Sequence, residues 1–121
     1  MNPRQLEYFR QLLLAWRKQL QTEISETLTH LSQQSMHEAD TTDRAQLESD
    51  ASLELRTRDR ESKLLGKIDA ALKRIDEGSY GYCEETGEPI SLARLMARPI
   101  ASLSLDAQER HERKERTYRD D

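Results

Sequence analysis

Acidic side chains are concentrated in one short stretch of the chain, residues 37–50. They are Glu38, Asp40, Asp43, Glu48 and Asp50. Only one cation, Arg44, opposes them, so the local charge of −4 equals the net charge of −4 of the whole chain. Neighbouring carboxylates can hold a divalent cation, or carry negative charge to a metal bound elsewhere. The spacing of Asp40 and Asp43 would let both face one ion.

The same stretch has a simpler structural interpretation. Residues 40–43 are Asp-Thr-Thr-Asp, which are residue types that make turns and cap helices. Gln46 follows Asp43 by three residues, as in a capping box. The residues by themselves leave both interpretations open.

The remaining reactive side chains do not form a set. Cys83 is the single cysteine, so an intramolecular disulfide is excluded, and its thiol is either a sensor or a packing group. His30, His37 and His111 are too scattered to share a metal ion. The sequence shows no nucleophile with a base and no phosphate-binding loop, so we expect no enzymatic activity.

Composition indicates long helices. The chain contains no valine, which argues against a core built from sheets. Ala, Glu, Lys, Leu and Arg make up about half of the 121 residues, as in coiled coils. A pI near 5.5 argues against direct DNA binding, which depends on a basic face. No apolar run approaches a membrane span or a secretory signal, so we expect a cytoplasmic protein without a membrane partner.

Two apolar stripes of similar length predict an antiparallel helical hairpin. The first begins after Asn2-Pro3, a cap followed by a first-turn proline. It consists of Leu6, Phe9, Leu13, Trp16, Leu20, Ile24, Leu28 and Leu31. Its spacing alternates between three and four up to Leu20 and then runs 4-4-3, which introduces a stutter. The second stripe, interrupted by the charged residues 56–63, consists of Leu47, Ala51, Leu55, Leu65, Ile68, Leu72 and Ile75.

Gly78 stops the second helix, and the chain beyond it must hold the open end of the hairpin. Five of the seven Gly and Pro residues fall in residues 78–99, which indicates a compact, turn-rich knob. Its expected core residues are Ile90, Leu92, Leu95, Met96 and Ile100, joined by the N-terminal Leu12, Leu13, Leu14 and Trp16. A last helix follows, with Ser104 or Asp106 as its start signal.

These elements predict an all-α protein with a long antiparallel coiled-coil hairpin. We expect an N-terminal helix over 1–36, an acidic tip over 37–45 and a second arm over 46–77. The knob then covers 78–103 and the C-terminal helix 104–121. An internally paired hairpin favours a monomer.

Three motifs along the chain resemble the DksA family of bacterial transcription factors. They are the tip pattern Asp40-x2-Asp43-x-Ala45, the stretch LELR-x-RDRE and the knob pattern GYC-E-x2-G-E-x-I. The resemblance covers residues 4–115. It implies a protein that binds RNA polymerase, inserts its coiled coil into the secondary channel and destabilises open promoter complexes. With ppGpp as effector, such proteins repress rRNA promoters and activate some amino-acid promoters in the stringent response. Asp40, Asp43 and Ala45 match the tip residues that act at the polymerase active site.

The resemblance also assigns contact residues. Arg60, Leu64 and Lys67 match positions that contact the rim helices of the channel, and their spacing places them on one helix face. Taken alone, that face is also typical of a solvated stripe with one anchoring leucine. Lys67 and Arg98 match basic positions that hold the ppGpp phosphates together with polymerase. The third basic position is Gln108 here, which bears on the strength of the ppGpp response. For Arg98, the alternative is a structural pairing with a carboxylate of the knob.

The resemblance aligns a zinc-ribbon frame whose ligands are gone. Cys83-x2-Thr86 and Ser104-x2-Ala107 stand in the place of four cysteines. Hydroxyls and a methyl group cannot replace thiolates, and one thiolate does not hold zinc. We therefore expect a degenerate, zinc-independent knob, with no metal and no cofactor.

Two other functions stay open. A Gre-type transcript-cleavage factor would use the paired tip carboxylates to position a second Mg²⁺, although the pattern with Ala45 favours the DksA role. A generic coiled-coil adaptor would have no affinity for polymerase.

Overall fold

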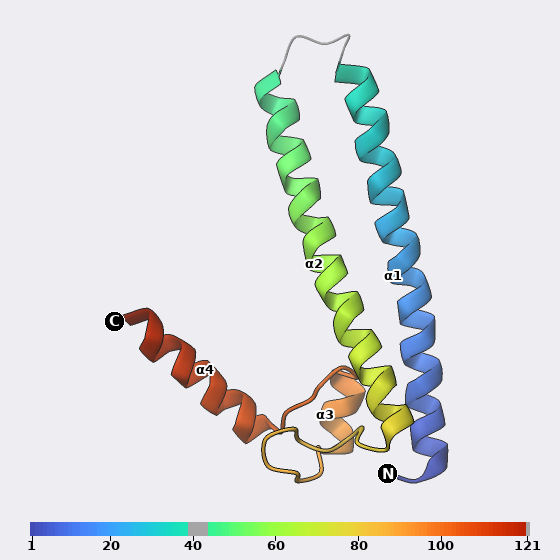
Figure 1. Ribbon diagram of the computed structural model, residues 1–121, viewed down its shortest axis with the longest axis vertical. Helices are drawn as coiled ribbons and strands as arrows, with labels where there is room; N and C mark the ends of the chain where they lie inside the picture. Colours follow the sequence, from blue (N-terminus) through green and yellow to red (C-terminus); the bar gives the residue numbers. More distant parts are fainter. Residues whose placement is uncertain (39–43, 121) are drawn as a thin grey trace. The chain divides into compact units, whose positions relative to one another are not determined.

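The protein is built from helices. The computed structural model describes the backbone of residues 1–38 and 44–120 and the side chains of residues 1–30 and 48–117. Its helices are α1 (Pro3–Glu38), α2 (Arg44–Glu77), α3 (Leu92–Ala97) and α4 (Leu105–Asp120) (Figure 1). These described ranges contain no strand, only an isolated antiparallel bridge between Tyr82 and Pro89. The predicted all-α class is confirmed.

The chain divides into two compact units. Unit 1 consists of residues 1–13 and 70–121, and unit 2 of residues 14–69. Helices α1 and α2 contribute to both units, whereas α3 and α4 belong to unit 1. Within the described ranges, no helix has an apolar stretch long enough to cross a membrane.

The start of α1 and the end of α2 lie where local sequence signals predict them. The Asn2 Oδ1 accepts a hydrogen bond from the Gln5 N–H at 2.8 Å, and the Asn2 N–H donates to the Gln5 Oε1 at 3.2 Å. This reciprocal pair satisfies amides that a helix start leaves without partners. Helix α2 ends before Gly78, whose φ is 82°, and the Ser79 N–H donates to the Arg74 carbonyl at 2.9 Å. The left-handed conformation favours glycine, so the predicted stop is confirmed.

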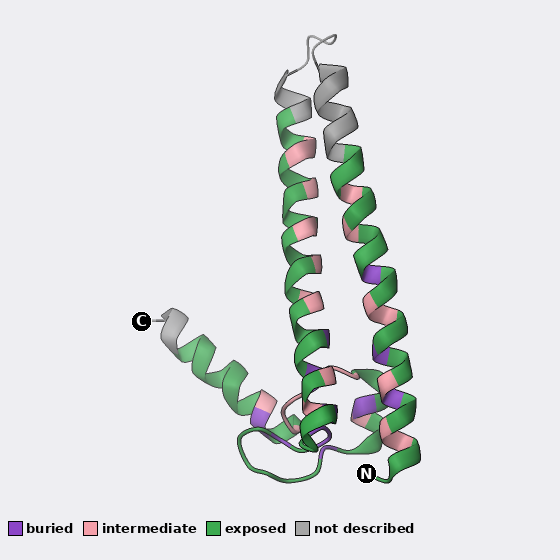
Figure 2. Ribbon diagram, turned by 45° about the vertical axis from the view of Figure 1, so that its right-hand side comes forward, coloured by how far each residue is buried: buried purple, intermediate pink, exposed green. Residues whose placement is uncertain are grey.

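The core of unit 1 forms around two aromatic rings. Phe9 and Tyr80 are each 1% exposed, and their ring centroids lie 5.7 Å apart. The Tyr80 hydroxyl donates to the Pro99 carbonyl at 2.7 Å, which satisfies the polar end of a buried ring. The other buried hydrophobic side chains in the described part of this unit are Leu13, Ala71, Ile75, Cys83, Ile90, Leu95, Ala101 and Ala107 (Figure 2).

The predicted core of the knob is partly wrong. Ile90 and Leu95 are buried and Ile100 is half-buried, as expected. Leu92 and Met96, however, are 46% and 53% exposed. These two lie one turn apart on the outer face of α3, while Leu95 faces inward. Tyr80 and Cys83 fill the core instead.

The predicted contribution of Leu12 to Leu14 is also only partly correct. Leu13 is fully buried, but Leu12 and Leu14 are exposed. Successive residues turn by about 100° around a helix, so three consecutive leucines cannot all face one core. Trp16 is half-buried.

Unit 2 is an antiparallel pair of helical segments, which lie side by side in Figures 1 and 2. Among the residues of this unit whose side chains the structure describes, Leu20 on α1 and Ile68 on α2 are buried. Arg17 joins the two helices here, since its Nε lies 2.6 Å from the Asp69 Oδ1. The predicted stripe is wrong at Leu28 and Leu55, which are 41% and 48% exposed.

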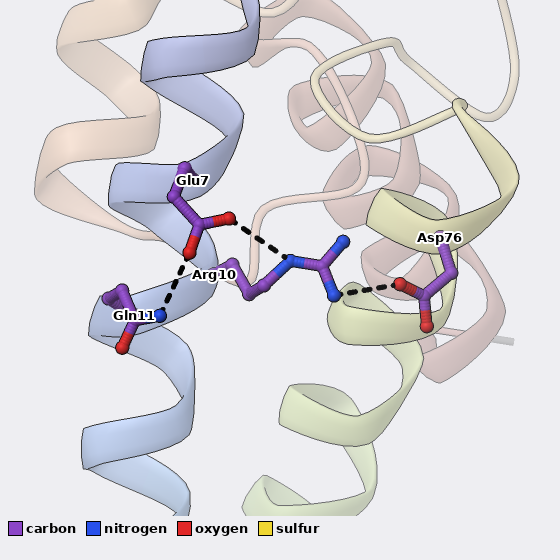
Figure 3. Close-up of polar contacts among 4 residues, drawn as sticks. All are labelled: Glu7, Arg10, Gln11 and Asp76. Atoms are coloured by element: carbon purple, nitrogen blue, oxygen red, sulfur yellow. Dashed lines mark hydrogen bonds and ion pairs between the residues drawn. The ribbon is translucent and has the colours of Figure 1, made fainter.

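A second polar link joins the same two helices within unit 1 (Figure 3). The Arg10 Nη1 lies 3.0 Å from the Asp76 Oδ1, and the Arg10 Nε lies 3.6 Å from the Glu7 Oε2. The Gln11 Nε2 donates to the Glu7 Oε1 at 2.9 Å. Glu7 therefore orients Arg10 toward Asp76.

Candidate functional site on helix α2 and the knob

The face of α2 predicted to contact a partner carries two exposed cations. Arg60 and Lys67 are exposed, and Leu64 between them is half-buried. Neither cation makes an ion pair with any residue that the structure describes. The spacing i, i+4, i+7 places the three on one face. This face thus offers positive charge around an apolar centre.

The predicted acidic tip falls mostly outside the described part of the chain. Asp40 and Asp43 lie outside the described residues. Ala45 lies in the first turn of α2, and its side chain is outside the described set. Glu48, the next acidic residue, is exposed on α2.

Arg98 ends helix α3 and lines an open pocket of unit 1. Its backbone N–H donates to the Arg94 carbonyl at 2.8 Å. The pocket, of about 440 Å³, is lined by Glu88, Pro89, Ser91, Arg94, Ala97, Arg98, Ser104, Leu105 and Asp106. Among the described residues, no carboxylate lies within ion-pair distance of the Arg98 guanidinium. The structural pairing considered for Arg98 is therefore not found there.

Position 108 supplies no positive charge. Gln108 is half-buried on α4, and its Nε2 donates to the Glu112 Oε1 at 3.4 Å. Lys67 belongs to unit 2 and Arg98 to unit 1, and both side chains are exposed.

The four positions of the zinc-ribbon frame come together in unit 1. Cys83 is 3% exposed, and its sulfur is hydrogen-bonded by the side chains and backbones of Thr86 and Ser104. The Ser104 Oγ also accepts a hydrogen bond from the Ala107 N–H at 3.3 Å, and Ala107 is fully buried. Burial raises the pKa of the Cys83 thiol, but these hydrogen bonds outweigh burial and lower its pKa from 9.0 to about 6.

This donor set does not fit zinc. It offers one sulfur, two hydroxyls and a methyl group, whereas structural zinc sites use four cysteine or histidine ligands. Both hydroxyls are already engaged, since the Thr86 Oγ1 accepts from the Glu88 N–H at 3.3 Å and the Ser104 Oγ from Ala107. The described residues contain no group of three or more His, Cys, Asp or Glu side chains that could hold a metal.

Two contacts around this frame were not predicted from the sequence. His111 on α4 pairs through its Nε2 with the Glu85 Oε1, in the loop after Cys83. The Arg74 Nη1 lies 3.9 Å from the Glu84 Oε1, and its guanidinium lies over the Tyr80 ring at 6.0 Å. In each ion pair the two residues lie in different helices or loops, so the periodicity of the sequence does not predict the contact.

Two family models together match most of the chain. Residues 5–75 match the family described as "DnaK suppressor protein DksA, N-terminal domain". Residues 78–113 match the "Prokaryotic dksA/traR C4-type zinc finger". The second match covers the frame in which Cys83 is the one remaining cysteine.

Curated relatives and solved structures agree with these matches. The chain is 62% identical, over its whole length and 85% of the relative, to "RNA polymerase-binding transcription factor DksA" of Caulobacter vibrioides. It is 47% identical to the Escherichia coli protein of that name, over 88% of this chain and 70% of the relative. The structure of transcription factor DksA2 from Pseudomonas aeruginosa is 43% identical, with a TM-score of 0.85 over 96% of this chain and 89% of the other. The fold, the motifs and these matches together show that the chain belongs to the DksA family.

Proposed function

We propose that this protein binds RNA polymerase in the cytoplasm and regulates the initiation of transcription, without being an enzyme itself. The observation that carries the proposal is the α2 face, where Arg60 and Lys67 have no ion-pair partner among the described residues and flank Leu64. Cations without internal partners are available to carboxylates of another protein, and an apolar centre supplies contact area. Relatives of this chain are named as RNA polymerase-binding factors, which supports polymerase as the partner.

The hairpin would act by entering the secondary channel of polymerase. Arg60, Leu64 and Lys67 would contact the rim helices, and the tip with Asp40, Asp43 and Ala45 would approach the active site. The charge of −4 in residues 37–50 supports this step, because carboxylates are attracted toward a site that holds Mg²⁺. Open promoter complexes would be destabilised as a result.

ppGpp would strengthen this effect in the stringent response. Lys67 and Arg98 would bind its phosphates together with polymerase. The Arg98 guanidinium supports that role, since it lies beside an open pocket and has no ion-pair partner among the described residues. Because Gln108 brings no charge, the response would rest on two cations of this chain.

The protein would do this without zinc. The support comes from the frame of Cys83, Thr86, Ser104 and Ala107, which lacks three of four thiolates and is closed by hydrogen bonds and packing. A monomer with no metal and no direct DNA contact is the proposed working form.

Transcription from an rRNA promoter in vitro, with and without ppGpp, tests the proposal. The wild-type protein should lower transcript yield, and ppGpp should lower it further. Asp43→Asn should still bind polymerase but lose the inhibition, and Lys67→Ala should lose the increment from ppGpp. Lys18→Ala, which removes an exposed lysine of α1, is the matched control and should behave as wild type.

Binding and cleavage assays separate the other functions. Arg60→Ala should weaken capture of polymerase about tenfold, the effect of losing a contact worth roughly 1.4 kcal/mol. RNA cleavage in backtracked complexes without any effect on initiation would instead identify a Gre-type factor. If the wild-type chain failed to capture polymerase, the proposal would be overturned and the coiled-coil adaptor would be the remaining function.

A further inference from the structure

At one level of unit 2, meaning one position along the axis of the helical pair, both helices turn a polar residue inward and a leucine outward. On α1, Thr27 is half-buried, whereas Leu28 is 41% exposed. On α2, Glu54 is half-buried, whereas Leu55 is 48% exposed. Thr27 and Glu54 line the same open groove of about 290 Å³, together with His30, so the two pairs lie at the same level.

The Thr27 hydroxyl donates to the Glu23 carbonyl at 2.9 Å, but the inward Glu54 carboxylate is incompletely satisfied. The Glu54 Oε1 lies 2.7 Å from the His30 Nδ1, but the Glu54 Oε2 is buried and has no hydrogen-bond partner in the described part of the chain. Two turns along α2, the buried Oε2 of Glu61 also lacks a partner there. A buried carboxylate oxygen without a partner destabilises the packing that encloses it.

The sequence offers a second packing at this level. Apolar residues are spaced by four at Leu20, Ile24 and Leu28 on α1, and at Ala51 and Leu55 on α2. Each step of four drifts by about 40° around a helix with 100° per residue. A rotation of each helix about its own axis by a few tens of degrees would therefore bring Leu28 and Leu55 toward the partner helix.

The two rotations are compatible with each other. Bringing Leu28 toward the seam on α1 and Leu55 toward it on α2 requires rotation in the same sense when each helix is viewed from its own N-terminus. Because the helices are antiparallel, the rotations have opposite senses when viewed from one end. The helices would thus turn like meshed gears, which keeps their surfaces in contact.

We propose that unit 2 has two seam packings in exchange. The described packing turns Thr27 and Glu54 inward, with Glu54 paired to the exposed His30. The second packs Leu28 against Leu55 and returns the Glu54 carboxylate to water. A partner that contacts Leu55 or Glu54 in one packing only would select that packing. Both packings belong to the free protein, so the inference does not depend on the proposed function.

Methyl relaxation-dispersion NMR on the full chain, with labelled leucines and no polymerase, tests this inference. Leu28 and Leu55 should show dispersion with one common exchange rate in the microsecond-to-millisecond range. Leu28→Ala should abolish dispersion at Leu55, and Leu55→Ala should abolish it at Leu28. Leu53→Ala is the matched control, since Leu53 is 58% exposed, lies two residues from Leu55 and faces away from both seams. It should leave the dispersion unchanged.

A second variant addresses the described packing. The double substitution Thr27→Leu and Glu54→Leu fills the present seam with apolar groups. It should raise the melting temperature by several degrees and remove the dispersion at Leu28 and Leu55. Flat profiles at both leucines in the wild-type chain would overturn the inference. The inference would also be overturned if Leu53→Ala and Leu55→Ala reduced the dispersion equally, with helicity by circular dichroism unchanged in both variants.

Discussion

The Ser104 Oγ accepts a hydrogen bond from the Ala107 N–H at 3.3 Å, which makes Ser104 the N-cap of helix α4. The same two positions form the second pair of the zinc-ribbon frame. A spacing with two intervening residues suits both a pair of zinc ligands and a helix cap, because a capping side chain accepts from the amide three residues further along. Ala107, fully buried at this turn, fills space where the frame has a ligand. In this chain these two positions therefore cap a helix and fill the core, whereas the matched family is described as a zinc finger.

Removing this cap should destabilise the knob. Ser104→Ala should lower the free energy of unfolding by about 1 kcal/mol, because the Ala107 amide loses its acceptor. The measurement is urea denaturation followed by circular dichroism. Ser104→Thr retains the capping hydroxyl without placing a carboxylate beside the Cys83 sulfur and serves as the control, with a smaller loss expected. Equal losses in the two variants would contradict a capping role.

Zinc should be neither bound nor required. We expect metal analysis to find less than stoichiometric zinc in the purified protein, and its helicity to persist in strong chelator, because one thiol cannot hold the ion. The triple substitution of Thr86, Ser104 and Ala107 by cysteine should create a zinc site, since these positions surround Cys83. One tightly bound zinc per wild-type chain would contradict the prediction.

The Cys83 thiol should make stability depend on pH. Its pKa is lowered from 9.0 to about 6 in the folded protein, where burial opposes and hydrogen bonds from Thr86 and Ser104 favour the thiolate. Between pH 6 and 9 the unfolded chain binds more protons, so stability rises with pH there, by at most about 1.4 kcal/mol per pH unit. This contribution is complete above pH 9 and is lost as the pH falls through 6.

Thiolate absorbance near 240 nm and urea denaturation across this range measure the effect. Cys83→Ser is the control and should show no absorbance change and a flatter pH profile. A wild-type thiol that titrates near pH 9 would contradict the assignment.

Local signals predicted the helices well, whereas contacts distant in sequence were not predicted. Asn2 with Gln5 and Gly78 mark helix ends through bonds within a few residues, so the sequence contains the whole signal. Helix α3 has six residues, too few for a period that would have revealed Leu92 and Met96 as exposed.

The seam of unit 2 and the frame around Cys83 show two further limits. Hydrophobicity favoured Leu28 and Leu55 as seam residues, but the His30–Glu54 pair occupies that level in the structure. One cysteine could not indicate the frame, which came from family resemblance alone. The hydrogen bond that Ser104 makes to the Cys83 sulfur follows from folding over about 20 residues of intervening chain, a separation without a local pattern.

The ion pair between Arg17 and Asp69 should contribute modestly to hairpin stability. The two atoms lie 2.6 Å apart, but the side chains are 38% and 49% exposed, so solvent screens their attraction. A double-mutant cycle with Arg17→Ala and Asp69→Ala should give a coupling energy of about 0.5 kcal/mol that shrinks in 1 M salt. A coupling above about 2 kcal/mol would show that the pair is shielded from solvent.

Gly66 is the one glycine inside a described helix, and no neighbour accounts for it. A Cβ added there meets nothing within 4 Å, and its φ lies outside the left-handed region. Gly66→Ala should therefore stabilise the protein by up to about 1 kcal/mol, because alanine restricts the unfolded chain and favours the helix. Ala70→Gly, at an exposed position one turn further along α2, is the reciprocal control and should destabilise it by a similar amount. Thermal unfolding of both variants measures this difference, and a loss of stability in Gly66→Ala would contradict the open space found around residue 66.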